Sequence, residues 1–144
     1  MTNLSTTSLY DACRYLSERD KGLARIITDV GACTLEIRNN RSVFEYLCRS
    51  IVYQQLSGKA AGTIHGRMLD LFAHRRPSAK ALLDMPIERL RAAGLSRPKS
   101  LALYDLSQRQ ASGLLPARRR LSQMTDQQIV ETLSPVRGIG EWSV

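Results

Sequence analysis

The last ten residues of the chain contain the pattern most suggestive of chemistry. Gly138, Ile139 and Gly140 place two glycines on either side of one apolar residue. Glycine permits positive φ and a close approach of the backbone to another surface, while the residue between the two can anchor the turn in a core. A helix that begins after such a turn directs free backbone N–H groups outward, where they bind phosphate. The pattern therefore predicts a contact with a nucleic-acid backbone.

The charge of the chain favours the same kind of partner. Its 144 residues include 21 Lys and Arg but 13 Asp and Glu, which gives a net charge of +8. Such a balance is typical of proteins that bind polyanions, although a solvated basic surface has the same composition. The candidate phosphate contacts are the backbone around Gly138, Ile139 and Gly140, the side chains of Arg137, Lys59 and Lys99, and a basic loop at 118–120.

The cysteines and histidines predict no metal site. Cys13, Cys33 and Cys48 are odd in number and lack Cys-x-x-Cys spacing, so we expect buried, reduced thiols rather than disulfides, metal ligands or an iron–sulfur cluster. His65 and His74 have no partners at metal-binding spacing. No apolar run approaches membrane-spanning length, and the first residues lack the pattern of an export signal, so we expect neither an anchor nor export.

The elements that must position these residues are expected to be helices, because apolar residues recur at helical spacing almost throughout. Ser42 with Glu45, and Thr125 with Gln128, form capping-box patterns that predict two helix starts. The first of these helices should be central to the fold. The expected helices cover 23–30 with Asp20 as cap and Gly31 as end, 43–53, 57–71, 78–85, 86–93 ending at Gly94, 97–112 with Ser96 as cap and Gly113 as end, and 126–133 before Pro135.

Two segments resemble a known family once these helices are placed. Residues 50–61 (Ser-Ile-Val-Tyr-Gln-Gln-Leu-Ser-Gly-Lys-Ala-Ala) and 136–143 (Val-Arg-Gly-Ile-Gly-Glu-Trp-Ser) look like the helix-hairpin-helix DNA glycosylases, in particular the 3-methyladenine DNA glycosylase II branch. Residues 90–99 are similar to that branch too, so the likeness runs from about Leu23 to the end of the chain. The resemblance implies an all-α glycosylase domain at 20–144 that ends inside the hairpin motif, preceded by a helical extension at 1–19.

The resemblance implies removal of alkylated bases from duplex DNA by hydrolysis of the N-glycosidic bond. The nucleotide must leave the base stack, and a wedge must fill the gap. The family places that wedge in the turn after the central helix, which corresponds to Gln54, Gln55 and Leu56; ordinary solvated capping is the alternative. An aromatic face attracts a cationic alkylated base, so Trp142 and Tyr53 are the candidate base pocket, with core packing as the alternative.

The resemblance also assigns the type of catalysis. Relatives that cleave the DNA strand carry a Schiff-base lysine where this chain has Trp142, so a monofunctional enzyme with water as nucleophile is implied. The family's catalytic Asp follows the helix after the hairpin and would lie beyond Val144. Asp126, Glu131 and Glu141 do not correspond to it. We therefore expect no catalytic residue in this chain and no glycosylase activity from the 144-residue polypeptide alone.

The remaining expectations concern ligands and setting. No cofactor is expected, apart from a structural monovalent cation that hairpins of this family often bind, here through Arg137, Gly138 and Gly140. The expected partner is double-stranded DNA containing alkylated bases, with a monomeric protein that has no membrane contact. The location would be the cytoplasm, with the nucleoid, in a bacterium and the nucleus in a eukaryote. The alternatives to an enzyme are a non-catalytic helix-hairpin-helix DNA-binding module and a non-functional gene fragment.

Overall fold

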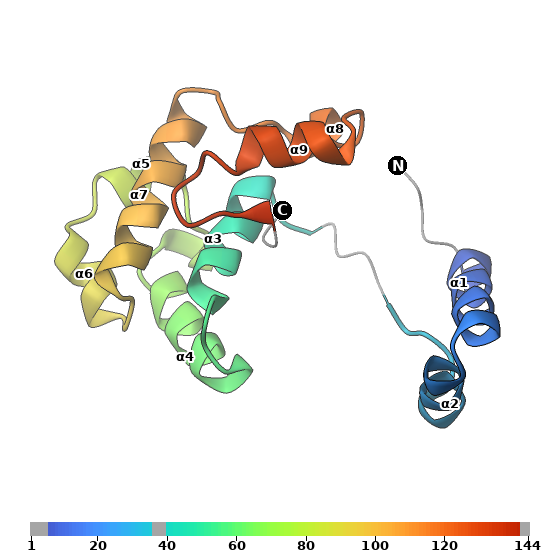
Figure 1. Ribbon diagram of the computed structural model, residues 1–144. Coiled ribbons are helices and arrows are strands. Elements are labelled where there is room, and N and C mark those ends of the chain that lie inside the picture. The colour runs from blue at the N-terminus through green and yellow to red at the C-terminus, as the bar shows by residue number, and fades with distance from the viewer. Residues whose placement is uncertain (1–5, 36–39, 142–144) are drawn as a thin grey trace. The chain divides into compact units, whose positions relative to one another are not determined.

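The fold is all-α, as the hydrophobic spacing predicts. The computed structural model describes residues 6–35 and 40–141, and within these ranges every regular element is a helix (Figure 1). The chain divides into two compact units, residues 1–40 and residues 41–144. Each unit is described by itself below. None of the helices in these ranges is both long and apolar enough to cross a bilayer.

The first unit is a pair of helices, α1 (Thr6–Arg19) and α2 (Lys21–Val30), which pack against each other. The predicted cap of α2 is confirmed, because the Asp20 carboxylate accepts hydrogen bonds from the amides of Gly22 (2.7 Å) and Leu23 (3.0 Å). Both helices fall within residues 1–40, whereas the sequence predicts a domain boundary between residues 19 and 20. That boundary stays a prediction.

The second unit contains the remaining described helices. They are α3 (Val43–Tyr53), α4 (Gly58–Leu69), the 3-10 helix η1 (Ala73–Arg75), α5 (Ala79–Leu83), α6 (Ile87–Ala92), α7 (Arg97–Ala111), α8 (Arg118–Leu121) and α9 (Asp126–Leu133). Helix α7 packs against α3, α5 and α6, and α3 also packs against α4. Because α3 and α7 lie side by side, each can place a terminus or a side chain at a common site (Figure 1).

Helix α3 is the central helix that the sequence predicts. Both halves of its capping box form, since the Ser42 hydroxyl accepts from the Glu45 amide and the Glu45 carboxylate accepts from the Ser42 amide. Its apolar stripe is buried in the core together with residues of α4, α5, α6, α7 and the hairpin. The buried residues of α3 are Phe44, Glu45, Leu47, Cys48, Ile51 and Val52.

An ion pair between buried Glu45 and exposed Arg76 anchors the start of α3. Glu45 is 6% exposed, and its carboxylate accepts hydrogen bonds from the Arg76 guanidinium at 2.9 and 3.1 Å. These bonds, with those from Ser42, outweigh the cost of burial and lower the pKa of Glu45 to about 2. The carboxylate therefore stays ionised through the pH range in which most proteins are stable.

The other predicted helix ends agree with the structure. Ser57, Ser78 and Ser96 cap α4, α5 and α7 through their hydroxyls. The capping box of Thr125 and Gln128 is complete at α9. These helix positions follow from local sequence, because a capping hydroxyl satisfies an amide within the same four residues.

Two local predictions are wrong. Only Cys48 is a buried thiol, whereas Cys13 is half-buried and Cys33 is exposed. Cys33 follows the end of α2 at Gly31, where the chain leaves the helix and no element covers it. Residues 118–120, predicted as a basic loop, form most of the short helix α8 instead. Arginine has a high helix propensity, so three in succession favour a helical turn.

Candidate nucleic-acid interface

The hairpin of residues 136–140 is anchored by its apolar residues. Val136 is 2% exposed and Ile139 is 4% exposed, which confirms the predicted anchoring role of the residue between the glycines. The Ile139 amide donates to the Val136 carbonyl at 2.9 Å and closes the turn. Gly138 has φ 77°, in the left-handed region that favours glycine, whereas Gly140 does not adopt a positive φ.

The amides of the hairpin differ in what they can bind. The Arg137 amide donates to Asp105 and the Ile139 amide to Val136, so both are used inside the protein. The amides of Gly138 and Gly140 donate no hydrogen bond within the described ranges, and both glycines are exposed. Of the predicted backbone contacts, these two fit an incoming phosphate.

Helix α7 holds the hairpin through two charged side chains. The Asp105 carboxylate accepts from the Arg137 amide at 2.8 Å and from the Arg109 guanidinium at 3.0 Å. Arg109 also donates to the Pro135 carbonyl at 2.7 Å. Two residues one helical turn apart on α7 thus fix the polypeptide just before Gly138. Neither contact could be predicted from local sequence, since 26 to 32 residues separate these side chains from their partners.

The turn after α3 presents the predicted wedge. Gln54 is the C-cap of α3 with an extended ψ of 134°, and Gln55 has φ 55°, which is unusual for a residue other than glycine. Leu56 follows and is 38% exposed. An exposed apolar side chain at a turn can insert between base steps. The role of Gln55 and Leu56 as a wedge stays a prediction.

The turn and the hairpin meet, although 84 residues separate them in sequence. The Gln54 side-chain amide donates to the Gly138 carbonyl at 2.6 Å. Lys99, on the first turn of α7, donates to the carbonyls of Val52 and Gln54 at 2.8 and 2.7 Å. Burial lowers the pKa of Lys99. A cavity of about 350 Å³ lies among these groups, lined by Gln54, Gln55, Pro98, Lys99, Ala102 and Gly138 with three neighbours.

Of the two predicted base-pocket residues, the structure describes Tyr53, whereas Trp142 lies outside the described residues. Tyr53 is half-buried, and the Arg49 guanidinium covers one face of its ring at 3.9 Å from the centroid. The His65 ring contacts Tyr53 edge-on, and burial, followed by the nearby positive charges of Arg41, Arg49 and Arg75, lowers the pKa of His65. A cationic base could therefore stack on Tyr53 only at the opposite face, or after Arg49 moves away.

A second cavity, of about 760 Å³, lies beside α3. It is lined by Tyr46, Arg49, Tyr53, Gln54 and Arg118, with apolar residues of α3, α8 and α9. The Arg118 guanidinium stands over the Tyr46 ring at 5.4 Å and donates to the Arg41 carbonyl at 3.1 Å. Aromatic rings and guanidinium groups thus gather beside the predicted wedge.

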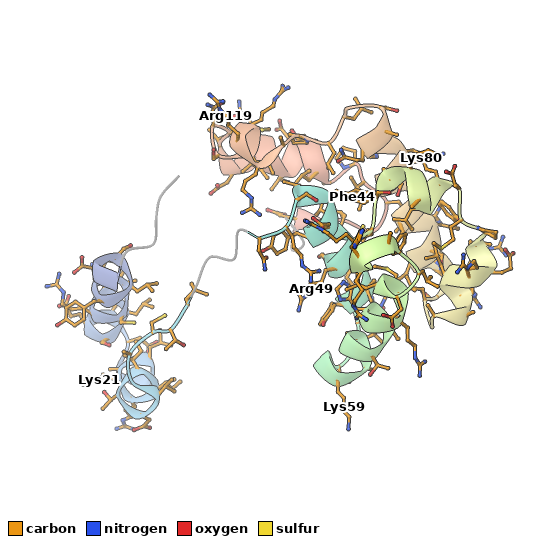
Figure 2. All side chains as sticks on the ribbon, turned by 180° about the vertical axis from the view of Figure 1, so that it is seen from behind. Lys21, Phe44, Arg49, Lys59, Lys80 and Arg119 are labelled. Atoms are coloured by element: carbon orange, nitrogen blue, oxygen red, sulfur yellow. The ribbon has the colours of Figure 1, made fainter. Side chains whose placement is uncertain are left out.

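The other predicted phosphate contacts have different surroundings. Arg137 and Lys59 have exposed side chains, and Lys59 extends away from the first turn of α4 (Figure 2). Lys99 instead donates two of its three N–H groups to carbonyls at the end of α3, an internal role that was not predicted from the sequence. The Asp105 carboxylate that holds the hairpin is already hydrogen-bonded, and Glu141 is exposed.

Of the three carbonyls predicted to bind a monovalent cation, that of Gly138 accepts a hydrogen bond, whereas those of Arg137 and Gly140 accept none within the described residues. The Gly138 carbonyl already accepts from Gln54, the Val136 carbonyl from Ile139, and the Pro135 carbonyl from Arg109. A cation would have to share the Gly138 oxygen with an N–H donor. In the described part of the chain, no group of three or more His, Cys, Asp or Glu side chains could hold a metal ion.

Comparison with known proteins identifies this arrangement. No family model matches the sequence. The chain is 32% identical over 144 residues to DNA-3-methyladenine glycosylase 1 of Schizosaccharomyces pombe, an alignment covering 96% of this chain and 61% of that protein. The solved structure of 3-methyladenine DNA glycosylase from the same organism, in complex with abasic DNA, superposes with a TM-score of 0.85 at 29% identity, covering 92% of this chain and 66% of that one. These matches support membership in the helix-hairpin-helix DNA glycosylase superfamily.

A bacterial structure supports the same membership. The DNA-3-methyladenine glycosidase of Bacillus halodurans matches with a TM-score of 0.73 at 30% identity, over 89% of this chain and 57% of that one. The chain thus spans about three-fifths of the length of these relatives. These matches confirm the family resemblance predicted from residues 50–61 and 136–143. The roles of individual residues remain predictions.

Proposed function

We propose that this chain forms the DNA-engaging part of a monofunctional DNA glycosylase that removes alkylated purines of the 3-methyladenine type by base flipping. The observation that carries the proposal is the hydrogen bond between Gln54 and Gly138, which holds the candidate wedge against the candidate phosphate-binding hairpin. A glycosylase needs both functions close together, because the phosphate contact fixes the strand from which the base is extruded.

The predicted site residues have defined parts in this proposal. The amides of Gly138 and Gly140, helped by the Arg137 side chain, bind the phosphates beside the lesion. Gln55 and Leu56 enter the space that the extruded nucleotide leaves. The base then stacks against Trp142, with the Tyr53 face opposite Arg49 as a second surface. Trp142 cannot form a Schiff base, so hydrolysis by water, without strand cleavage, is the reaction proposed.

The 144-residue polypeptide expressed alone is proposed to bind DNA without releasing bases. Glycosidic hydrolysis needs a carboxylate beside the cationic sugar. Asp105 already accepts hydrogen bonds from Arg137 and Arg109, and Glu141 does not correspond to the family's Asp. The second candidate function is a non-catalytic module that docks on DNA.

Two measurements on the purified polypeptide test the proposal. Fluorescence anisotropy compares its affinity for a duplex containing an abasic analogue with that for the intact duplex, and chromatography detects 3-methyladenine released from methylated DNA. The glycosylase proposal predicts tighter binding to the abasic duplex. Equal affinity for both duplexes would support the docking module instead. Base release would overturn the proposed lack of activity while supporting the assigned reaction.

Two finer expectations remain proposals. A structural monovalent cation at Arg137, Gly138 and Gly140 would make the melting temperature higher in potassium chloride than in tetramethylammonium chloride at equal ionic strength. Equal melting temperatures in the two salts would show that no bound potassium ion stabilises the hairpin. A DNA-directed enzyme would work in the nucleoid-containing cytoplasm of a bacterium or in the nucleus of a eukaryote, which localisation of a tagged protein tests.

A further inference from the structure

We propose that Lys99 is a positioning residue that locks the wedge turn to the hairpin, so that phosphate binding and insertion into the duplex occur as one rigid step. The proposal rests on the proposed function, because it assigns a use to the wedge. It differs from the expectation that Lys99 contacts a phosphate. The geometry places its ammonium on protein carbonyls, at the end of the helix that leads into the turn.

The end of α3 needs a donor of this kind. The last carbonyls of a helix have no partner within the helix and carry partial negative charge, so a buried helix end requires donors from elsewhere. Val52 is fully buried, and the chain after it turns away with Gln54 in an extended conformation. Lys99 supplies one donor to each of the two carbonyls, at 2.8 Å for Val52 and 2.7 Å for Gln54.

Lys99 can act as a fixed point because it stands on a rigid element. It lies in the first turn of α7, where the Ser96 hydroxyl accepts a hydrogen bond from the Lys99 amide and Pro98 restricts the backbone. The same helix carries Asp105, which binds the hairpin at the Arg137 amide. Helix α7 therefore contacts the wedge turn through Lys99 near its start and the hairpin through Asp105 further along.

Gln54 completes the connection between the two segments. Its backbone carbonyl accepts from Lys99, and its side chain donates to the Gly138 carbonyl at 2.6 Å. The next residue, Gln55, has φ 55°, a conformation that is sterically unfavourable for a residue other than glycine. A strained turn persists only when its surroundings hold it. Removing the ammonium would let Gln55 relax and would move Leu56 away from its exposed position.

The test uses a duplex with 2-aminopurine opposite a tetrahydrofuran abasic analogue, since insertion beside the 2-aminopurine changes its fluorescence. Lys99→Met removes both hydrogen bonds while keeping a long apolar side chain. Lys99→Arg keeps the charge and the donors. The matched control is Lys80→Met, which removes one positive charge from a side chain that is 86% exposed and is paired with Asp84 on α5 (Figure 2). Thermal melting of each variant reports on its folding.

The proposal predicts a specific separation of effects. Wild type and Lys80→Met change the 2-aminopurine signal at saturation. Lys99→Met binds with an unchanged salt dependence but loses most of the signal change, and Lys99→Arg restores it. A full signal change in Lys99→Met would overturn the proposal. The proposal would also be overturned if Lys99→Met kept the full 2-aminopurine signal at saturation but showed a salt dependence reduced by about one phosphate contact. Lys99 would then be a phosphate ligand.

Amide hydrogen exchange separates this inference from the proposed function. In the free protein, the amides of Gln54 and Leu56 should exchange faster in Lys99→Met than in Lys80→Met, because each closes the end of α3. If wild type gives no signal change with the duplex, the proposed function fails, and exchange alone decides the structural part. Unchanged exchange at both amides would overturn the locking role even where DNA binding is normal.

Discussion

Substitution of Gly138 by alanine tests the hairpin at its most constrained position. Gly138 has φ 77°, and a Cβ there would lie 3.5 Å from the Ala102 Cβ, which is an ordinary contact. The steric cost inside the protein is therefore the left-handed conformation alone. That cost is roughly 1–2 kcal/mol, offset in part by the lower entropy of unfolded alanine relative to glycine, which leaves a destabilisation of about 1 kcal/mol.

The effect on DNA binding should exceed the effect on stability. The new methyl group would stand beside the Gly138 amide, which is exposed and donates no hydrogen bond within the described ranges. A hydrogen bond to a charged group contributes about 1.5–3 kcal/mol, so its loss should weaken binding about 10- to 100-fold. Fluorescence anisotropy with an abasic duplex measures the affinity, and urea denaturation measures the free energy of unfolding.

Gly113→Ala provides a matched control. Gly113 has φ 70°, and a Cβ there would have no neighbour within 4 Å, so the backbone penalty is the same as at Gly138. It follows α7, at the end opposite the first turn that carries Lys99. Both variants should lose similar stability, and only Gly138→Ala should lose affinity. Equal affinities of the two variants for the duplex would refute the assignment of the Gly138 amide to a phosphate.

Three further predictions concern charge and thiol chemistry. Glu45 has a lowered pKa in the folded protein, so its stabilising contribution is complete above its ordinary value of 4.5 and is lost as the pH falls to about 2. On acidification the free energy of unfolding should fall by about 1–2 kcal/mol from this group, once solvent screening at the exposed Arg76 is counted. Acid denaturation of Glu45→Gln should not show this loss. Arg137→Met should reduce the slope of log affinity against log salt by about 0.9, and an unchanged slope would exclude a phosphate contact. Cys33 should react with a thiol reagent in the native protein while Cys48 reacts only on unfolding, because burial raises the pKa of the Cys48 thiol; equal rates would contradict the structure.

Local sequence was sufficient to predict most of the secondary structure. The capping boxes at Ser42 and Thr125 form as predicted, because each satisfies amides within one turn. Gly138 adopts the positive φ expected of a hairpin glycine, and Ile139 is buried beneath it. The basic segment at 118–120 was mistaken for a loop, since charge alone says little about backbone conformation.

The interactions that assemble the candidate site could not be predicted in this way. Lys99 and Gln54 were each assigned to DNA from the pattern, yet each also binds another part of the protein, 45 and 84 residues away respectively. Asp105 carried no recognisable motif, although it holds the Arg137 amide. Such contacts depend on how α3 and α7 pack, and packing is determined by the whole core rather than by a local pattern.

The most direct test of the account is a titration of the ¹⁵N-labelled 144-residue protein with an abasic duplex, followed by the shift of each backbone amide in NMR spectra. The account predicts that the amides of Gly138, Gly140, Gln55 and Leu56 shift together and by more than those of α5 and α6. Shifts concentrated on another surface, with these four amides unmoved at saturation, would contradict it.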